Sequence, residues 1–200
     1  FDGSTVTDID GNIYNTVLIG TQIWMKENLK ATKFNDGTTI PLVKNASEWS
    51  DLSTPAYCWY YSSQELFGNT YGALYNWYAI NTRKLCPTGW HVPGNDEWGA
   101  LIKYLGGDSV AGGKLKETGT IHWASPNSGA TNETGFTALG SGFRYYDGLY
   151  TNMYVSSNWW SATQSCPTTA FLRYILYDND DIITIRPEMT FGAAVRCIKD

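Results

Sequence analysis

Residues 86–98 read Cys-Pro-Thr-Gly-Trp-His-Val-Pro-Gly-Asn-Asp-Glu-Trp, and this stretch decides the fold because it leads into the best-marked helix of the chain. Asn95 can cap that helix, and the acidic pair Asp96 and Glu97 favours its positive N-terminal end. The apolar residues recur at helical spacing, at Trp98, Leu101, Ile102 and Leu105. Gly106 and Gly107 then end the helix, so the stretch predicts a strand-to-helix junction and one amphipathic helix.

On the N-terminal side of this stretch, the sequence predicts one further helix and a hairpin. Over residues 73–80, Leu74, Trp77 and Tyr78 form one apolar face at helical spacing. Residues 6–14 predict two strands around an Asp10-Gly11 turn. The spacing of Asp8, Asp10 and Gly11 also resembles the start of a calcium loop, but no Glu stands where such a loop closes, so the hairpin is the preferred interpretation.

On the C-terminal side, helical periodicity is not expected past Gly107. The chain there is rich in Gly, Ser, Thr and Asn and is punctuated by short candidate strands at residues 142–146, 159–162, 171–177, 182–186 and 194–198. Two early helices and a late antiparallel meander predict an α+β fold, organised as a single domain over residues 1–200.

The composition narrows the class of protein. The 200 residues include 9 Trp, 14 Tyr, 7 Phe and 20 Gly, with only 16% charged residues, which excludes a disordered chain and a helical bundle. A net charge of −5 argues against nucleic acid as a partner. No apolar run approaches the roughly 20 residues that a membrane span needs, and Phe1 is not expected to begin a signal peptide.

Metals and cofactors are not expected. The four cysteines, at 58, 86, 166 and 197, form no Cys-x-x-Cys pair and allow three pairings if all are bridged. Their even number fits an oxidising compartment, and free buried thiols for at least two of them are an equal alternative. The two histidines are far apart in sequence, which disfavours zinc. Oxygen ligands at Asp178, Asn179, Asp180 and Asp181 make a Ca²⁺ site conceivable, but a solvated turn between two strands is the preferred interpretation.

Several motifs together resemble a known family. The Gly89-Trp90 to Glu97-Trp98 pattern and the ending Val195-Arg196-Cys197 resemble the C-type-lectin-like fold of formylglycine-generating enzymes. Nearly the whole chain resembles the Fibrobacter succinogenes major paralogous domain family, through residues 23–29, 71–77, 135–139 and 159–163. The resemblance implies a loop-rich C-type-lectin-like domain, a scaffold role for Trp24, Trp77, Trp90 and Trp98, and closeness, with a bridge, of Cys86 and Cys197. It implies no oxidase chemistry, because the closely spaced late cysteine pair of those enzymes is absent.

No signature of an enzyme class is present. Nucleophile-elbow, P-loop, dinucleotide and His-Glu-x-x-His patterns are absent from the sequence. His91 and His122 are interpreted as structural, and Glu97 as a capping residue at the first turn of its helix. The prediction is therefore a non-catalytic protein.

The stronger candidates are aromatic and polar residues of the C-terminal half. Tyr and Trp offer rigid contact area, while Asn, Thr, Asp and Arg offer hydrogen bonds, a mixture typical of binding loops. Strand alternation over residues 171–177 predicts that Arg173 and Tyr177 share an outer face. It places Leu172, Tyr174 and Leu176 on the other face, toward the core. The predicted ligand-binding residues are Tyr145, Tyr146, Tyr150, Asn152, Tyr154, Asn158, Trp159, Arg173, Tyr177, Asp178, Asn179, Asp181, Thr184 and Arg186.

The functional hypothesis is a ligand-binding module of receptor or adhesin type, secreted or displayed on a bacterial cell or phage particle. Its expected partner is a protein or glycan on another cell or particle. Residues 178–186 are rich in side chains reachable by adenine-directed mutagenesis of Asn codons, which resembles variable proteins diversified by retroelements. The alternatives are an enzyme of the formylglycine-generating or carbohydrate-active class, and a structural module of a surface or appendage protein.

Overall fold

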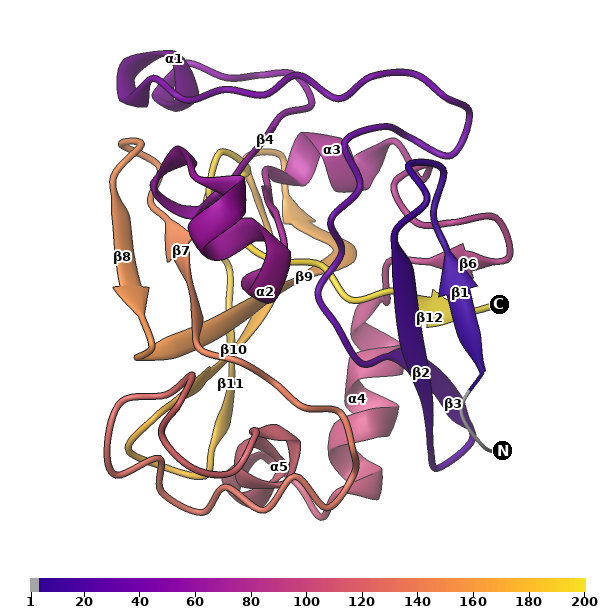
Figure 1. Cartoon of the computed structure of the whole chain (residues 1–200), viewed down its shortest axis with the longest axis vertical. Coiled ribbons are helices and arrows are strands. Elements are labelled where there is room, and N and C mark those ends of the chain that lie inside the picture. The colour runs from indigo at the N-terminus through magenta and orange to yellow at the C-terminus, as the bar shows by residue number, and fades with distance from the viewer. Residues whose placement is uncertain (1–3) are drawn as a thin grey trace.

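The computed structural model describes residues 4–200 and shows a mixed α/β domain with more strand than helix (Figure 1). A five-stranded sheet has the order β1-β2-β3-β12-β6, and every neighbouring pair is antiparallel. Its strands are β1 (Thr5–Thr7), β2 (Ile13–Ile19), β3 (Gln22–Met25), β6 (Trp90–His91) and β12 (Ile198–Lys199). The last strand of the chain thus lies inside this sheet, between an early strand and a middle one.

The predicted opening hairpin is confirmed, because Val6 of β1 pairs with Tyr14 of β2. The Asp8 carboxylate holds the turn by accepting hydrogen bonds from the backbone of Asp10 (3.0 Å) and Asn12 (2.9 Å) and from the Tyr14 hydroxyl (2.6 Å). Gly11 supplies the positive φ that the turn needs. The Asp8 oxygen atoms are therefore used in hydrogen bonds that hold the hairpin turn.

A second, three-stranded sheet has the order β11-β10-β9 and forms the middle of the C-terminal half (Figure 1). It contains β9 (Ser156–Cys166), β10 (Thr169–Leu176) and β11 (Ile182–Ile185). Three of the predicted strands are thus confirmed here with shifted bounds, and the one predicted over residues 142–146 is confirmed as β7 (Ser141–Arg144). Two further antiparallel pairs join β4 (Tyr57–Cys58) to β5 (Leu74–Tyr75) and β7 to β8 (Tyr150–Met153). The predicted strand 194–198 is mostly extended chain with isolated bridges, and only Ile198 enters β12.

The helices are short. They are α1 (Ala46–Ser50), α2 (Asn69–Tyr71), α3 (Trp77–Asn81), α4 (Asn95–Tyr104) and α5 (Asp108–Leu115), with a 3₁₀ turn η1 (Tyr60–Ser62) and a π turn η2 (Gln64–Gly68) before α2. No helix among residues 4–200 has the length and apolar character needed to cross a bilayer.

The predicted helix α4 is confirmed, but its cap is one residue earlier. Gly94 is the N-cap, and its backbone N–H donates to the Glu97 carboxylate at 2.7 Å. Asn95 is the first helical residue, and its backbone N–H donates to Thr163 on β9 at 2.9 Å. Gly107 closes the other end by donating to the Ile102 carbonyl at 2.9 Å, as expected of a glycine-terminated helix.

The predicted helix over residues 73–80 is wrong in its first half. Asn76 caps α3 by accepting from the Ala79 N–H at 3.2 Å, so the helix begins only at Trp77. Leu74 and Tyr75 instead form β5, and Tyr75 also pairs with Ala193. The apolar spacing that predicted a helix reflects burial on two different elements.

The prediction that no helix follows Gly107 is wrong, because α5 does. Its sequence contains Gly112 and Gly113, which disfavour a helix by propensity. Both glycines pack directly against backbone, Gly112 against the residues before β11 and Gly113 against Gly129, and a Cβ would clash at either position. Close packing therefore outweighs the helix propensity of this segment.

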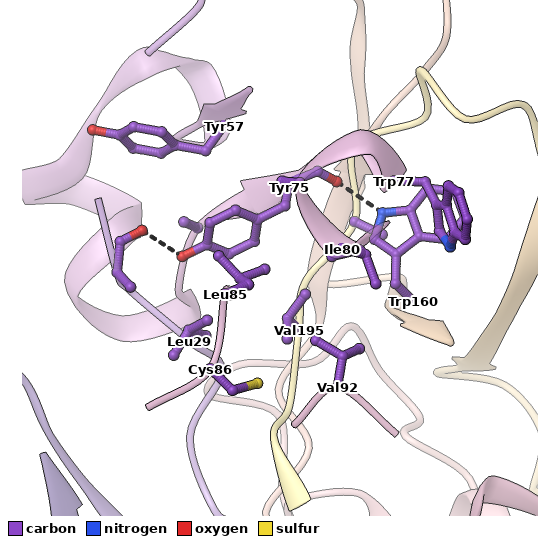
Figure 2. Packing of buried hydrophobic residues seen from close by; sticks show 14 of the residues in the cluster. Leu29, Tyr57, Tyr75, Trp77, Ile80, Leu85, Cys86, Val92, Trp160 and Val195 are labelled. Carbon is purple, nitrogen blue, oxygen red and sulfur yellow. Dashed lines mark hydrogen bonds between the residues drawn. The ribbon is translucent and has the colours of Figure 1, made fainter. Parts of the chain in front are cut away.

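The core has two main parts that meet at β9. Trp160 belongs to the part around Tyr75, Trp77 and Val195, while Trp159 belongs to the part around Trp24 and Trp98. Figure 2 shows the first part, where the Trp160 indole donates to the Tyr75 carbonyl at 2.8 Å and the Tyr75 hydroxyl donates to the Ala31 carbonyl at 2.7 Å.

Trp24, Trp77 and Trp98 are buried as predicted, but Trp90 is only partly buried and packs on the edge of the core.

A disulfide joins Cys86 to Cys197, with 6.0 Å between the two Cα atoms, which is the pairing that the family resemblance implies. It links the segment before α4 to the segment before β12. Cys58 is a buried free thiol, and burial raises its pKa to about 11. Cys166 is an exposed free thiol that lies 3.0 Å from the Thr169 hydroxyl, and this contact lowers its pKa to about 7.

Three cationic side chains are buried and held by backbone carbonyl groups. Lys116 donates to the carbonyls of Leu176 (3.0 Å) and Asn179 (2.8 Å). Arg144 donates to four carbonyls, among them Val43 (2.7 Å) and Gly148 (2.9 Å), and its guanidinium lies over Trp49. Arg196 donates to the carbonyls of Phe136 and Thr137 and to the Asn28 side chain, and burial lowers its pKa to about 9. Saturating a buried cation with hydrogen bonds offsets much of its desolvation cost.

Candidate functional site

A groove of about 700 Å³ lies over one face of the β9-β10-β11 sheet. Strand register builds its floor, because Tyr174 and Leu176 of β10 pair with Asn158 and Ser156 of β9 and therefore point to the same side. One wall comes from β7, β8 and the turn between them, and the other from the segment after β11. The full lining is Phe143, Tyr145, Tyr146, Asn152, Ser156, Asn158, Thr169, Tyr174, Leu176, Ile185, Arg186, Pro187, Glu188 and Phe191, which we call the aromatic groove.

The aromatic side chains of this groove form a continuous cluster. Phe143 stacks on Phe191 with 4.6 Å between ring centroids, and Tyr145 lies 5.9 Å from Phe143 and 4.6 Å from Tyr146. Tyr145 and Tyr146 are 40% and 46% exposed, although they contact other rings. The cluster thus offers flat apolar area with hydroxyl groups available to a ligand.

Buried Arg144 fixes the turn that carries these two tyrosines. Within the turn, Tyr145 N–H donates to the Leu149 carbonyl at 2.7 Å, and Gly148 adopts a positive φ of 83°. A Cβ at Gly148 would clash with the backbone of Ala46, so only glycine fits there. Arg144 donates to the Gly148 carbonyl and ties the turn to residues 43–45. The tyrosines are therefore presented on a held turn.

Polar groups lie beside the rings. The Asn158 amide nitrogen donates to Ser156 Oγ at 2.8 Å, which fixes the side chain on the groove floor. Arg186 packs over the Phe171 ring at 4.9 Å, with Glu188 two residues later along the same wall. Neither charged side chain forms an ion pair with residues 4–200, so both remain available at the rim.

Five of the predicted binding residues meet in the aromatic groove: Tyr145, Tyr146, Asn152, Asn158 and Arg186. Sequence reasoning missed Phe143, Tyr174, Glu188 and Phe191. Tyr174 was predicted to point into the core with Leu172, and its strand alternation is correct, but the groove opens above that part of the sheet.

The predicted outer face of β10 is wrong. Arg173 is only 5% exposed and lies on the opposite side of the sheet from the groove, with Thr184 as its partner on β11. Leu172 and Ile175 are both fully buried, in different parts of the core, so β10 is covered on both faces. Trp159 is also fully buried and exposes no surface to a ligand.

The remaining predicted residues lie elsewhere. Tyr150 packs on Tyr60 at 5.3 Å and on the Arg144 guanidinium, and exposed Tyr154 lies edge-on to Tyr71 at 6.0 Å. Tyr177 packs against the second core part. The turn with Asp178, Asn179 and Asp181 packs on α5, where Gly113 N–H donates to the Asp180 carbonyl at 3.1 Å. No three His, Cys, Asp or Glu side chains among the described residues are grouped to hold a metal ion.

A smaller cleft of about 300 Å³ contains His91. Its ring nitrogens lie 2.7 Å from Glu97 Oε1 and 2.6 Å from Asp200 Oδ1, so two carboxylates orient it. The lining of this cleft, within residues 4–200, holds no Ser and no free thiol, since Cys86 is in the disulfide. His122 likewise pairs with Glu117 at 2.7 Å and lies edge-on to Tyr71.

Replacing His91 by Gln is expected to destabilise the domain more at about pH 5.5 than at about pH 8.5. Partial burial works to lower the pKa of His91, but its bonds to Asp200 and Glu97 outweigh burial and raise that pKa above 6.5. When the pKa is higher in the folded state than in the unfolded state, the protonated side chain stabilises the fold. This stabilisation is complete at pH values below the unfolded-state pKa and is lost as the pH rises through the folded-state pKa. Urea unfolding of the wild type and the variant at the two pH values measures their difference in free energy of unfolding. The same difference at both pH values would contradict the prediction.

The fold and the groove together define the class: a mixed α/β, strand-rich domain that carries an open aromatic groove on a three-stranded sheet. Residues 17–199 match the model of the Fibrobacter succinogenes major domain, and the chain belongs to that family. The name of the family states no activity. Comparisons with curated proteins and with solved structures found no match.

Proposed function

We propose that this domain is a non-catalytic ligand-binding module of receptor or adhesin type, and that its ligand, a protein or a glycan, is bound in the aromatic groove. The observation that carries the proposal is that residues from β7 to Phe191, far apart in sequence, converge on one groove of about 700 Å³. That volume is in the range of ligand sites, about 300–1,000 Å³, and its mixture of rings and a few polar groups is typical of them.

The proposal includes a C-type-lectin-like fold, and a secreted or surface-displayed location on a bacterial cell or phage particle. The family membership and the early capped helix support the fold. The Cys86–Cys197 disulfide supports an oxidising location, because disulfides persist mainly outside the cytosol.

Diversification by a retroelement is also part of the proposal. Of residues 178–186, only Ile185 and Arg186 line the groove. Variation over this range would therefore alter one wall of the groove and the turn that packs on α5. A reverse-transcriptase gene beside the coding region, with an imperfect repeat carrying Asn codons at the varied positions, is the expected finding. A flanking sequence with neither would contradict this part alone.

The enzyme alternative rests on one observation, the pairing of His91 with Glu97 and Asp200 in a cleft. Such a pairing orients the imidazole but engages both of its nitrogen atoms, so one carboxylate must move away before His91 can act as a general base. A nucleophile or water must then come with the substrate. Turnover of any glycoside or ester substrate that disappears in the His91→Gln variant would favour this alternative over the binding module.

The groove is tested with a Tyr145→Ala/Tyr146→Ala double variant on an array of bacterial and plant cell-wall oligosaccharides, and against a displayed peptide library. The wild type is expected to bind members of at least one set, and the variant to lose about tenfold or more in affinity, because exposed aromatic anchors dominate binding energy. The stability of the variant should stay within about 0.5 kcal/mol of the wild type for each exposed site.

Tyr104→Ala is the matched control, because Tyr104 is an exposed tyrosine that lines a different depression, near Leu18 and Lys114. Its affinity should equal that of the wild type. Absence of binding to both sets, or equal losses in the control, would refute the proposal.

A further inference from the structure

Arg173 is a buried cation that has no hydrogen-bond partner among residues 4–200. Lys116, Arg144 and Arg196 each donate to several carbonyls, whereas Arg173 donates to no atom of residues 4–200. It is 95% buried, since its exposed fraction is 5%, and its Nε and Nη1 atoms are covered without an acceptor. A buried charge without a partner is costly, so such a group points to a missing acceptor.

The guanidinium borders a cleft of about 510 Å³ on the side of the sheet opposite to the aromatic groove. The cleft lies between β10, β11 and the α4–α5 junction. Its other polar lining consists of Thr184, which pairs with Arg173 across the strands, the exposed Lys103 at the end of α4, and Gly107 with Asp108. Arg173 therefore borders this cleft, but its Nε and Nη1 atoms are covered, so a ligand meets the guanidinium through Nη2 or after a small movement of the side chain.

The start of α5 adds to the positive character of this cleft. Gly107 is the N-cap of α5, and its carbonyl accepts from Val110 and Ala111. The first amide groups of the helix, those of Asp108 and Ser109, donate to no backbone carbonyl in residues 4–200. The first turn of a helix leaves such donors free and carries a partial positive charge. Burial lowers the pKa of Arg173. The charge of Asp108, the one acidic side chain of the lining, acts against this lowering, although the two side chains form no ion pair.

We propose that this cleft, formed by Arg173, Lys103, Thr184 and the first turn of α5, binds an oxyanion group: a carboxylate, sulfate or phosphate. Guanidinium and ammonium groups with free amides form the strongest hydrogen bonds to such groups. An inorganic ion fills only part of 510 Å³, so the cleft also has room for an oxyanion carried on a larger molecule, such as an acidic sugar. This site is separate from the proposed ligand groove and does not depend on it.

The test is NMR of the ¹⁵N-labelled protein, which follows the Arg173 Nε–H and the Asp108 and Ser109 amides. Sodium sulfate, phosphate, acetate and glucuronate are each titrated against sodium chloride of equal ionic strength. We expect saturable shifts of these signals with at least one oxyanion and not with chloride. Tighter binding of glucuronate than of acetate assigns the site to an oxyanion on a larger molecule; the reverse assigns it to a free ion.

Variants distinguish oxyanion binding by Arg173 from a purely structural role of this side chain. Arg173→Gln should lose about tenfold or more in affinity, because hydrogen bonds to charged groups are among the strong ones. Lys103→Gln, at an exposed position, should weaken binding about two- to threefold, and Asp108→Asn should strengthen it by a similar factor. Lys44→Gln is the control of equal charge change, and it should bind the oxyanion as the wild type does, since Lys44 is exposed and lines neither this cleft nor the aromatic groove.

Absence of any saturable shift would overturn the proposal. If no oxyanion binds and the Asp108→Asn variant shifts the Arg173 signal in sodium chloride, the proposal is likewise overturned. Asp108 would then be the partner of Arg173 in solution. Loss of ligand binding in the aromatic groove would leave this site untouched, so the two proposals fail independently.

Discussion

Removing the Cys86–Cys197 disulfide through a Cys86→Ala/Cys197→Ala double variant is expected to lower the free energy of unfolding by about 4–5 kcal/mol. The bridge spans 111 residues, and the chain-entropy model gives about 4.7 kcal/mol for a loop of 100 residues. Both cysteines are buried, and alanine avoids placing a hydroxyl there. Urea unfolding followed by tryptophan fluorescence measures the difference.

Cys166→Ala is the matched control, because Cys166 is an exposed free thiol whose loss should change stability by no more than about 0.5 kcal/mol. A reducing agent should destabilise the wild type and leave the double variant unchanged. A loss below about 1 kcal/mol would show that the unfolded chain gains little freedom without the bridge.

Replacing Trp98 by Ala is expected to cost about 3–5 kcal/mol, as large buried aromatic side chains do. Trp98 is fully buried on α4 and contacts Trp24 and Trp159, with ring centroids 4.9 and 6.0 Å away. Its removal leaves a cavity between α4, β3 and β9 that these rigid rings cannot collapse to fill. Chemical denaturation of the variant measures the loss.

Trp90→Ala is the comparison, because Trp90 is the same residue type but only partly buried at the edge of the core. It should cost clearly less than Trp98→Ala, although the family resemblance implies a scaffold role for both. Equal losses would mean that partial exposure of Trp90 does not reduce its contribution.

The sequence predicted correctly those helices and strands whose ends are set by residues close together in the chain. The hairpin turn at Asp8 and Gly11 and the helix α4 depend on neighbouring residues, so the residues alone identify them. The helix α5 was missed because Gly112 is favoured by contact with the backbone before β11, a partner far along the chain. The start of α3 was misplaced for a similar reason, since Tyr75 is held in a strand by Ala193.

The candidate site was predicted only in part. Alternation correctly placed Arg173 and Tyr174 on opposite sides of β10, but it could not tell which sides would be covered. Core side chains cover parts of both faces of this central strand. Arg173 therefore lies at a cleft on one face, and Tyr174 lines the groove on the other. The tyrosines of the turn after β7 were identified because exposed turns are recognisable from short polar stretches.

The position of β12 between β3 and β6 has a consequence for synthesis on the ribosome. The amino-terminal strands are made first, yet β3 has no neighbour on one side until Ile198 pairs with both Trp24 and His91. Until residues 197–199 leave the exit tunnel, the nascent chain keeps one edge of β3 unpaired and Cys86 without its disulfide partner. The domain is therefore expected to complete its folding only after β12 has been translated, and the native disulfide of Cys86 forms only once Cys197 has been synthesised.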